Sequence, residues 1–386
     1  MALKDNSADN RAAHIKNCRA CGAPLYGAPA LEYRNMPHSA QHLPMPGDDC
    51  SGTDLRIMEC SACGLLQLDC GPVPYYREVI RACGLSQAMS AFRRKQFSSF
   101  VNEFNLKEKK FLEAGCGSGE YLSIMKEAGT DAYGTEYSAE SAEKCRRQGL
   151  KVSGMFPSGG NKIPGGLFDA FGLFNSFEHF PNPADFLGTI RANLTENAAG
   201  IIEVPDFEGS IRDSVFFTFI PDHLFYFTRK TLKRTIENNG FDVLRIDSVW
   251  HGNILSATVK RRERFHAGGF ISAEENFRRK AKEFIKGMKA AFWGAGHEAL
   301  FLLASSGFTS TDIKYVIDSA PFKQGRLTPA TGIPIVPPDI LEKDPPQSII
   351  IAAGSYTGEI AEQIQKKYGR RFRLAVVKDN TLEELQ

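Results

Sequence analysis

FLEAGCGSG, residues 111–119, joins an apolar run that predicts a β-strand to the sequence EYLSIMKEAG, which predicts an α-helix. Gly115, Gly117 and Gly119 alternate with other residues along this junction. Glycine lets a backbone turn tightly and approach a ligand without a clash at Cβ. The stretch therefore predicts a ligand-binding turn at the end of a strand.

Strand and helix patterns continue to alternate on the C-terminal side of this turn. DAYGTEY, FDAFGLFN (168–175) and GIIEVP (200–205) predict strands, and the segments between them contain helix patterns. Such alternation predicts an α/β fold, in which a parallel sheet carries helices on both faces. A second series of the same kind runs from AAFWGAG (290–296) to FRLAVVKD (372–379), so we expect a second α/β domain.

The spacing of the glycines separates two classes of ligand. In the dinucleotide fingerprint G-x-G-x-x-G the third glycine would fall at position 120, where this chain has Glu120. Glu113-x-Gly115-x-Gly117-x-Gly119 instead resembles the first motif of class I S-adenosylmethionine-dependent methyltransferases. The resemblance implies that this loop binds S-adenosylmethionine.

Further cofactor-binding residues are expected at the ends of the next strands. Glu136 follows the second strand, where a carboxylate can accept hydrogen bonds from both ribose hydroxyls. On the same resemblance, Phe156 flanks the adenine and Asn175 lies near the sulfonium. His179 is then expected on the floor of the acceptor site.

Two cysteine pairs precede the methyl-donor motif. They are Cys18-x2-Cys21 and Cys60-x2-Cys63, and four thiolates in a tetrahedral array are what a closed structural Zn²⁺ site requires. Nine cysteines cannot all form intramolecular disulfides, which also favours metal binding. We therefore predict a structural zinc site.

The order of these parts resembles one family along nearly the whole chain from Cys18. The zinc pairs, the glycine motif, the segment PDHLFYF (221–227) and the stretch RLTPATGIPIVPP (326–338) are similar to the deoxysugar C-methyltransferases. That family methylates nucleotide-linked keto-sugars. The resemblance implies a small N-terminal zinc-binding module, a central Rossmann-like class I methyltransferase domain, and a C-terminal Rossmann-like domain that helps to hold the nucleotide-sugar.

The resemblance also implies a mechanism. His223 would remove the proton α to a ketone, with Asp222 beside it and His179 as a nearby polar contact, and the resulting carbon nucleophile would attack the sulfonium methyl in line. A tyrosine of the N-terminal module would enter the acceptor pocket, and we favour Tyr76 over Tyr75. The family tends to carry Tyr where this chain has Ile220.

These patterns together predict five segments. In chain order we expect a disordered tail over 1–16, the zinc-binding module over 17–75, the methyltransferase domain over 76–262, a helical connector over 263–287 and the C-terminal domain over 288–386.

Two other functions remain open at this point. One is O- or N-methylation of a sugar-like small molecule on the same scaffold, with His223 acting on a hydroxyl or amine. The other is a zinc-ribbon interaction protein with a degenerate methyltransferase fold, although Glu113, the glycines and Glu136 are all intact.

Composition restricts the partners. The chain has 47 Lys+Arg and 45 Asp+Glu, a net charge of +2, which argues against a nucleic-acid binder. No segment reaches the roughly 20 apolar residues of a membrane span, and the polar N-terminus lacks a signal sequence. We expect a cytoplasmic protein, a monomer or a weak homodimer, that acts on a small molecule.

Overall fold

The computed structural model describes residues 14–39, 43–78, 85–379 and 381–385. The chain folds as two units, Met1–Glu263 and Arg264–Gln386. Most of the expected tail lies outside the described residues, but Ile15 N–H donates a hydrogen bond to Asp69 O (2.6 Å).

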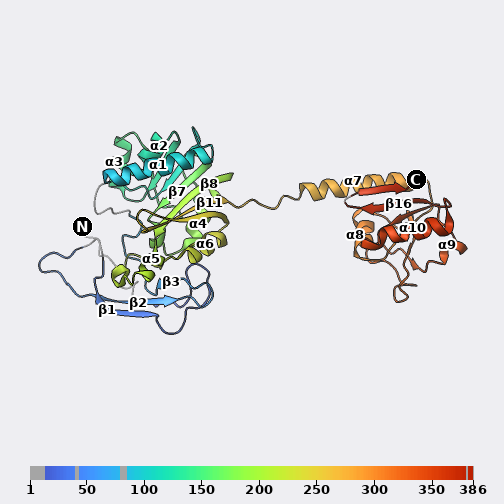
Figure 1. Cartoon of the computed structure of the whole chain (residues 1–386), viewed down its shortest axis with the longest axis horizontal. Coiled ribbons are helices and arrows are strands. Elements are labelled where there is room, and N and C mark those ends of the chain that lie inside the picture. The colour runs from blue at the N-terminus through green and yellow to red at the C-terminus, as the bar shows by residue number, and fades with distance from the viewer. Residues whose placement is uncertain (1–13, 40–42, 79–84, 380, 386) are drawn as a thin grey trace, which may run out of the picture. The chain divides into compact units, whose positions relative to one another are not determined.

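The central sheet of the first unit has seven strands in the order β10-β11-β8-β7-β4-β5-β6 (Figure 1). Strands β4 to β8 pair in parallel with one another, and β11 runs antiparallel to both of its neighbours. The predicted α/β fold is confirmed, with a mixed sheet. The strands are β4 (Lys110–Ala114), β5 (Asp131–Glu136), β6 (Lys151–Gly154), β7 (Phe168–Phe174), β8 (Leu194–Pro205), β10 (Phe241–Val249) and β11 (Ile254–Arg261).

Helices cover both faces of this sheet because successive strand residues point to opposite sides. Phe111 of β4 packs in one core cluster with α1 and α2, whereas Leu112 packs in another with α4 and α6. The helices are α1 (Gln87–Glu103), α2 (Glu120–Glu127), α3 (Ala139–Arg147), η1 (Phe177–His179), α4 (Pro183–Ala192), α5 (Phe207–Arg212), η2 (Phe216–Thr218) and α6 (Arg229–Asn238).

A smaller sheet joins the N-terminal segment to the central domain. Its order is β1 (Leu31–Met36), β2 (Thr53–Glu59), β3 (Leu66–Leu68) and β9 (Phe225–Tyr226). Strand β9 comes from the segment that follows His223, so the cysteine-rich region supplies the sheet on which that segment is fixed. Cys18 and Cys60 also share a core cluster with Phe177, so the two regions pack as parts of one unit.

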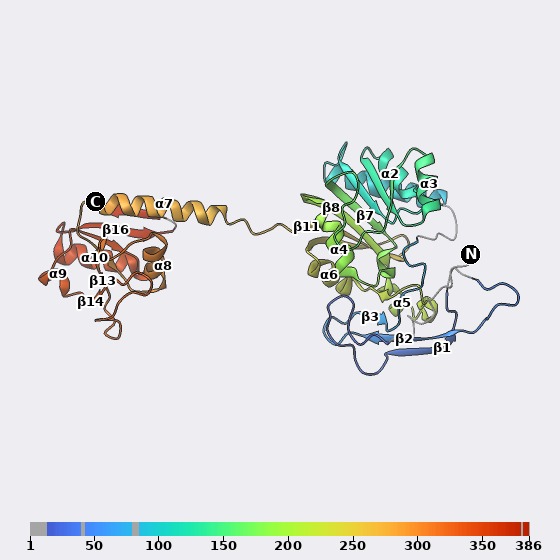
Figure 2. The same ribbon diagram turned by 180° about the vertical axis from the view of Figure 1, so that it is seen from behind.

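The second unit contains a six-stranded sheet, β14-β13-β12-β15-β16-β17 (Figure 2). One face of this sheet packs against Phe277 and Phe284 of α7 (Gly268–Ile285). This helix lies in the segment that was expected to be a helical connector. The remaining elements are β12 (Ala290–Trp293), α8 (His297–Ser305), β13 (Ile313–Ile317), β14 (Ile335–Val336), α9 (Ile340–Lys343), β15 (Ser348–Ile351), η3 (Gly354–Tyr356), α10 (Thr357–Tyr368), β16 (Arg373–Lys378) and β17 (Thr381–Leu385). Among the described residues, no helix is long and apolar enough to cross a membrane.

Candidate functional site

The candidate cofactor site lies where the order of the central sheet reverses. Strand β4 pairs with β5 on one side and with β7 on the other. In open α/β sheets, ligands bind outside the carboxyl ends of the strands at such a reversal. The loop 115–119 after β4 and Asn175 after β7 both leave the sheet at this edge.

The loop after β4 depends on its glycines. Gly115, Gly117 and Gly119 have φ of +77°, +54° and +83°, the left-handed region that other residues rarely adopt. A Cβ at Gly119 would also lie 2.5 Å from Leu150 Cδ1, so this glycine lets α2 pack closely on its neighbours. Glu113 is buried within β4, next to this loop.

Glu136, at the end of β5, is tied to the glycine loop. Its Oε2 accepts a hydrogen bond from Gly117 N–H (2.9 Å) and its Oε1 accepts one from Ser138 N–H (2.8 Å). Burial raises the pKa of this carboxyl, although both hydrogen bonds oppose that effect. Each carboxylate oxygen retains a further accepting position, so the residue can still accept hydrogen bonds from two hydroxyls.

Phe156, after β6, packs among aromatic rings. Its ring centroid lies 5.0 Å from that of Phe180, 5.5 Å from that of Phe186 and 5.9 Å from that of Tyr76. Tyr76 is therefore brought to the predicted adenine-flanking residue. Its hydroxyl accepts a hydrogen bond from Arg77 Nε (2.9 Å).

The other tyrosine of this pair reaches the predicted acceptor side. Tyr75 donates a hydrogen bond to Asp222 Oδ1 (2.6 Å), and its hydroxyl is 2.7 Å from Ser39 Oγ. Tyr75 is thus the tyrosine of this pair that contacts Asp222, and Tyr76 is the one that packs against Phe156. Adjacent residues in a turn point in different directions, and the sequence alone could not separate the two.

The segment that carries Asp222 and His223 is held by backbone hydrogen bonds on two sides. Leu224 N–H donates to Glu178 O (2.9 Å), and Leu68 N–H donates to Leu224 O (3.0 Å). The segment is therefore fixed between η1 and β3. This arrangement brings together two histidines that are far apart in sequence.

His179 and His223 lie against each other above a buried carboxylate. Their ring centroids are 4.9 Å apart, with the rings inclined at 67°. Glu178 Oε1 lies 3.8 Å from His179 Nε2 and 3.9 Å from His223 Nε2. Burial, together with the neighbouring His179, lowers the pKa of His223 to about 3, so this imidazole is neutral at pH 7.

Glu178 is a residue that the sequence analysis did not single out. Its position directly before His179 in the sequence could have indicated that it lies near the acceptor site. Burial raises the pKa of its carboxyl group, because a charged carboxylate is poorly stabilised away from water.

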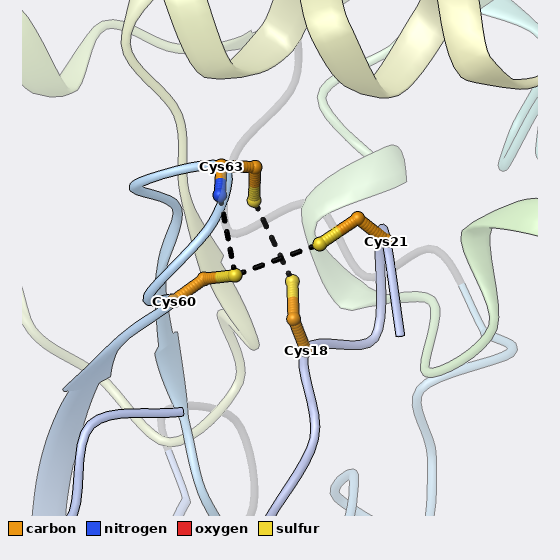
Figure 3. A group of neighbouring side chains, drawn as sticks. All are labelled: Cys18, Cys21, Cys60 and Cys63. Carbon is orange, nitrogen blue, oxygen red and sulfur yellow. Dashed lines mark hydrogen bonds between the residues drawn. The ribbon is translucent and has the colours of Figure 1, made fainter. Parts of the chain in front are cut away.

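The four predicted zinc ligands converge on one point (Figure 3). Cys18 Sγ lies 3.7 Å from Cys63 Sγ, and Cys21 Sγ lies 3.5 Å from Cys60 Sγ. A tetrahedron with Zn–S bonds of about 2.3 Å has sulfur–sulfur edges of about 3.8 Å. The four sulfurs therefore fit such an ion with small adjustments.

The thiols of this cluster differ in acidity. Burial raises the pKa of Cys18 to about 11. Burial acts in the same direction on Cys60, but hydrogen bonds from Cys63 N–H and Ala62 N–H outweigh it and lower the pKa of Cys60 to about 7. Backbone N–H groups that point at a sulfur stabilise a thiolate, which is the form that binds metal.

The second unit has a cavity of about 660 Å³ at the carboxyl ends of its strands. Gly294 and Gly296, which follow β12, line it together with Asp318 after β13. Asp318 accepts a hydrogen bond from Ala295 N–H (2.8 Å) and forms an ion pair with Lys323 Nζ (2.9 Å). The carboxylate thus already holds the glycine turn in place.

Two family models and one known protein match the sequence of this chain. A methyltransferase domain model matches residues 89–246, and a model of a C-methyltransferase C-terminal domain matches residues 268–376. C-methyltransferase NovU of Streptomyces niveus is 23% identical over 390 residues, which cover 90% of this chain and 92% of NovU. The chain is an S-adenosylmethionine-dependent methyltransferase, and these matches support transfer to carbon.

Similar solved structures include two methyltransferases. Plantazolicin methyltransferase BpumL is 12% identical, with a TM-score of 0.38 over 45% of this chain and 86% of that protein. An S-adenosylmethionine-dependent methyltransferase from Clostridium acetobutylicum ATCC 824 is 13% identical, with a TM-score of 0.37 over 44% of this chain and 92% of that protein.

Proposed function

We propose that this chain is an S-adenosylmethionine-dependent C-methyltransferase that acts on a nucleotide-linked keto-sugar or a similar ketone. The observation that carries the proposal is the position of the His223 imidazole, whose ring centroid lies 4.9 Å from that of His179 in a segment held against η1, which follows β7. A neutral imidazole can take the proton α to a ketone. The full-length similarity to a C-methyltransferase supports carbon as the acceptor atom.

The cofactor is proposed to bind in the loop after β4. Gly115 and Gly117 let the backbone approach its methionine portion, Glu136 accepts the ribose hydroxyls, Phe156 flanks the adenine and Asn175 lies near the sulfonium. Asn175 has φ +52°, so the chain turns sharply where β7 ends. S-adenosylmethionine supplies an electrophilic methyl group.

Cofactor affinity should depend on the charge of Glu136. We expect Glu136→Gln to raise the Kd for S-adenosylmethionine by about 10- to 100-fold, because a hydrogen bond to a charged group contributes about 1.5–3 kcal/mol. Isothermal titration at pH 7.5 measures the change. Glu140→Gln, at an exposed position on α3, is the matched control, and an unchanged Kd in Glu136→Gln would remove this residue from the cofactor site.

The acceptor chemistry is proposed to run through His223. This imidazole takes the proton from the carbon next to the ketone, and the electron pair of the broken C–H bond forms the enolate. Asp222, which accepts a hydrogen bond from Tyr75, and His179, whose Nδ1 lies 2.7 Å from Asp222 O, fix the surroundings of the base. With the cofactor bound, the enolate carbon would attack its methyl group in line, the S–CH3 bond would break, and its electron pair would stay on sulfur, which leaves as a neutral thioether.

Zn²⁺ is proposed to occupy the four-cysteine cluster and to have a structural role. Cys18, Cys21, Cys60 and Cys63 are all sulfur ligands, and such a set is typical of closed structural sites. The cavity after β12 in the second unit is the proposed place for the nucleotide. Backbone N–H groups at a glycine turn before a helix can donate hydrogen bonds to phosphate oxygens.

Hydrogen exchange at carbon tests the proposed reaction. Nucleotide 4-keto-sugars are incubated with the protein in D₂O, with and without S-adenosylmethionine, and followed by mass spectrometry and proton NMR. We expect deuterium at the carbon next to the ketone, and a product heavier by one methylene group when the cofactor is present.

Two other outcomes of the exchange experiment would contradict the proposed reaction. Methyl transfer without exchange at any carbon would point to a hydroxyl or amine acceptor. Absence of both reactions with every keto-sugar would overturn the substrate class and leave the cofactor site to be tested by binding.

A further inference from the structure

Glu178 is a buried carboxylate beneath the two imidazoles of the proposed acceptor site. Its side chain is 2% exposed, against 26% for His179 and 21% for His223. Its Oε2 is buried and accepts no hydrogen bond from any described residue. The carboxylate is thus far less exposed than the two imidazoles close to it.

A hydrogen bond to Asp222 places a proton on one ring nitrogen of His179. Its Nδ1 lies 2.7 Å from Asp222 O, and a carbonyl oxygen can only accept, so Nδ1 carries the hydrogen. In the neutral ring Nε2 is then an acceptor. In that form Nε2 of His179 cannot donate a hydrogen bond to Glu178. The imidazole that can donate to this carboxylate is therefore that of His223.

His223 presents Nε2 to Glu178, so Nδ1 is the nitrogen left for a substrate. A proton on Nε2 would point toward the carboxylate and leave the lone pair on Nδ1. The distance of 3.9 Å is longer than a hydrogen bond, and catalytic contacts of this kind often shorten when substrate binds.

We propose that Glu178 is the positioning residue of the base: its carboxylate holds the proton of His223 on Nε2, leaves Nδ1 basic, and stabilises the imidazolium formed during turnover. This inference rests on the proposed role of His223. The proton leaves carbon and binds Nδ1, the C–H electron pair forms the enolate, and the positive charge on the ring faces the negative carboxylate. After methyl transfer the proton returns to solvent from His223.

Burial disfavours charge on both partners of this pair. It raises the pKa of Glu178 and, together with the neighbouring His179, lowers the pKa of His223. The imidazolium formed during turnover would therefore be stabilised by an anion at this position. Asp222 is next to His223 in the chain, but the Asp222 carboxylate is engaged by Tyr75. Among the described residues, Glu178 is the acid whose Oε1 lies close to both rings, 3.8 Å from His179 Nε2 and 3.9 Å from His223 Nε2.

The kinetic test uses Glu178→Gln, which keeps the shape and removes the charge. Replacing the orienting acid of a Ser-His-Asp triad by its amide lowers kcat by about 10⁴-fold, and we expect a loss of at least about 10²-fold here, with the Kd for S-adenosylmethionine changed less than about twofold. Loss of the anion makes His223 a weaker base, so the acidic limb of kcat/KM moves to lower pH. The kcat of Glu178→Asp should be at least about tenfold higher than that of Glu178→Gln. Glu196→Gln, at an exposed position on β8, is the control.

A spectroscopic test does not depend on the substrate. In the full chain labelled with ¹⁵N-histidine, the His223 signals are identified by their loss in His223→Asn, and we expect Nε2 to be protonated and Nδ1 to be unprotonated. This preference should be lost in Glu178→Gln. If the keto-sugars fail as substrates but the tautomer behaves so, the proposed function is wrong and the positioning role stands.

Three results would overturn the inference. The first is a proton on Nδ1 of His223 in the unaltered chain. The second is a kcat loss in Glu178→Gln with no shift of the acidic limb and no rescue by aspartate, which is the behaviour of a purely structural residue. The third is a second metal equivalent, beyond the cysteine site, that is lost in Glu178→Gln, because the cluster would then hold a cation and not a proton.

Discussion

Replacing His223 by asparagine is expected to lower kcat for methyl transfer by about 10³-fold, within the range that a general base contributes. The imidazole is neutral at pH 7 because burial lowers its pKa to about 3, and asparagine offers no basic nitrogen in its place. Cofactor affinity should stay within about twofold, because the glycine loop and Glu136 lie on other elements. Turnover and titration calorimetry with S-adenosylmethionine measure the two effects separately.

A matched control and a stability measurement accompany this variant. His251→Asn is suitable because His251 is exposed and has φ +59°, a conformation that asparagine tolerates. The pKa of His223 is about 3 in the folded chain, against an ordinary value of 6.5. Between these pH values the unfolded chain binds one more proton, so folding stability falls as pH falls. The Tm of His223→Asn should therefore fall less than the Tm of the unaltered chain when the pH is lowered from 6.5 to 4.5. Preserved turnover in His223→Asn would exclude it as the base.

The turn of the glycine loop after β4 could be predicted from sequence because its geometry is local. The left-handed φ angles of Gly115, Gly117 and Gly119 are a direct consequence of the residue type. Periodicity in the strands and helices around the loop likewise predicted the α/β fold. The four-cysteine cluster was predicted on similar grounds, because each Cys-x2-Cys pair forms within a single turn.

The acceptor side could not be predicted to the same depth because it depends on contacts between distant segments. The pairing of Leu66 with Tyr226 attaches the His223 segment to the N-terminal sheet, and neither residue carries a sequence signal for it. The choice between Tyr75 and Tyr76 follows from that docking. The burial of Glu178 follows from it too, since β3 and the His223 segment close over η1.

Replacing Cys60 by serine is expected to abolish zinc binding at the proposed four-cysteine site and to destabilise the first unit. Loss of a structural metal is among the changes that cost more than about 4 kcal/mol, and for a domain of this size about 4 kcal/mol corresponds to a fall in Tm of roughly 10 °C. The control is Cys50→Ser, an exposed cysteine outside the cluster. Metal analysis and thermal unfolding of both variants measure the effect.

The position of the cluster explains why this loss should reach the acceptor site. Cys60 begins the turn that links β2 to β3, and β3 pairs with β9, which starts two residues after His223. If the metal is lost, β3 loses its anchor, and the backbone hydrogen bond from Leu68 to Leu224 has no fixed donor. Cys60→Ser should therefore lose turnover together with stability, while S-adenosylmethionine, held by β4 and β5, still binds below the lowered Tm. An unaltered Tm after complete removal of the metal would exclude a structural role, and retained turnover would separate the cluster from the acceptor site.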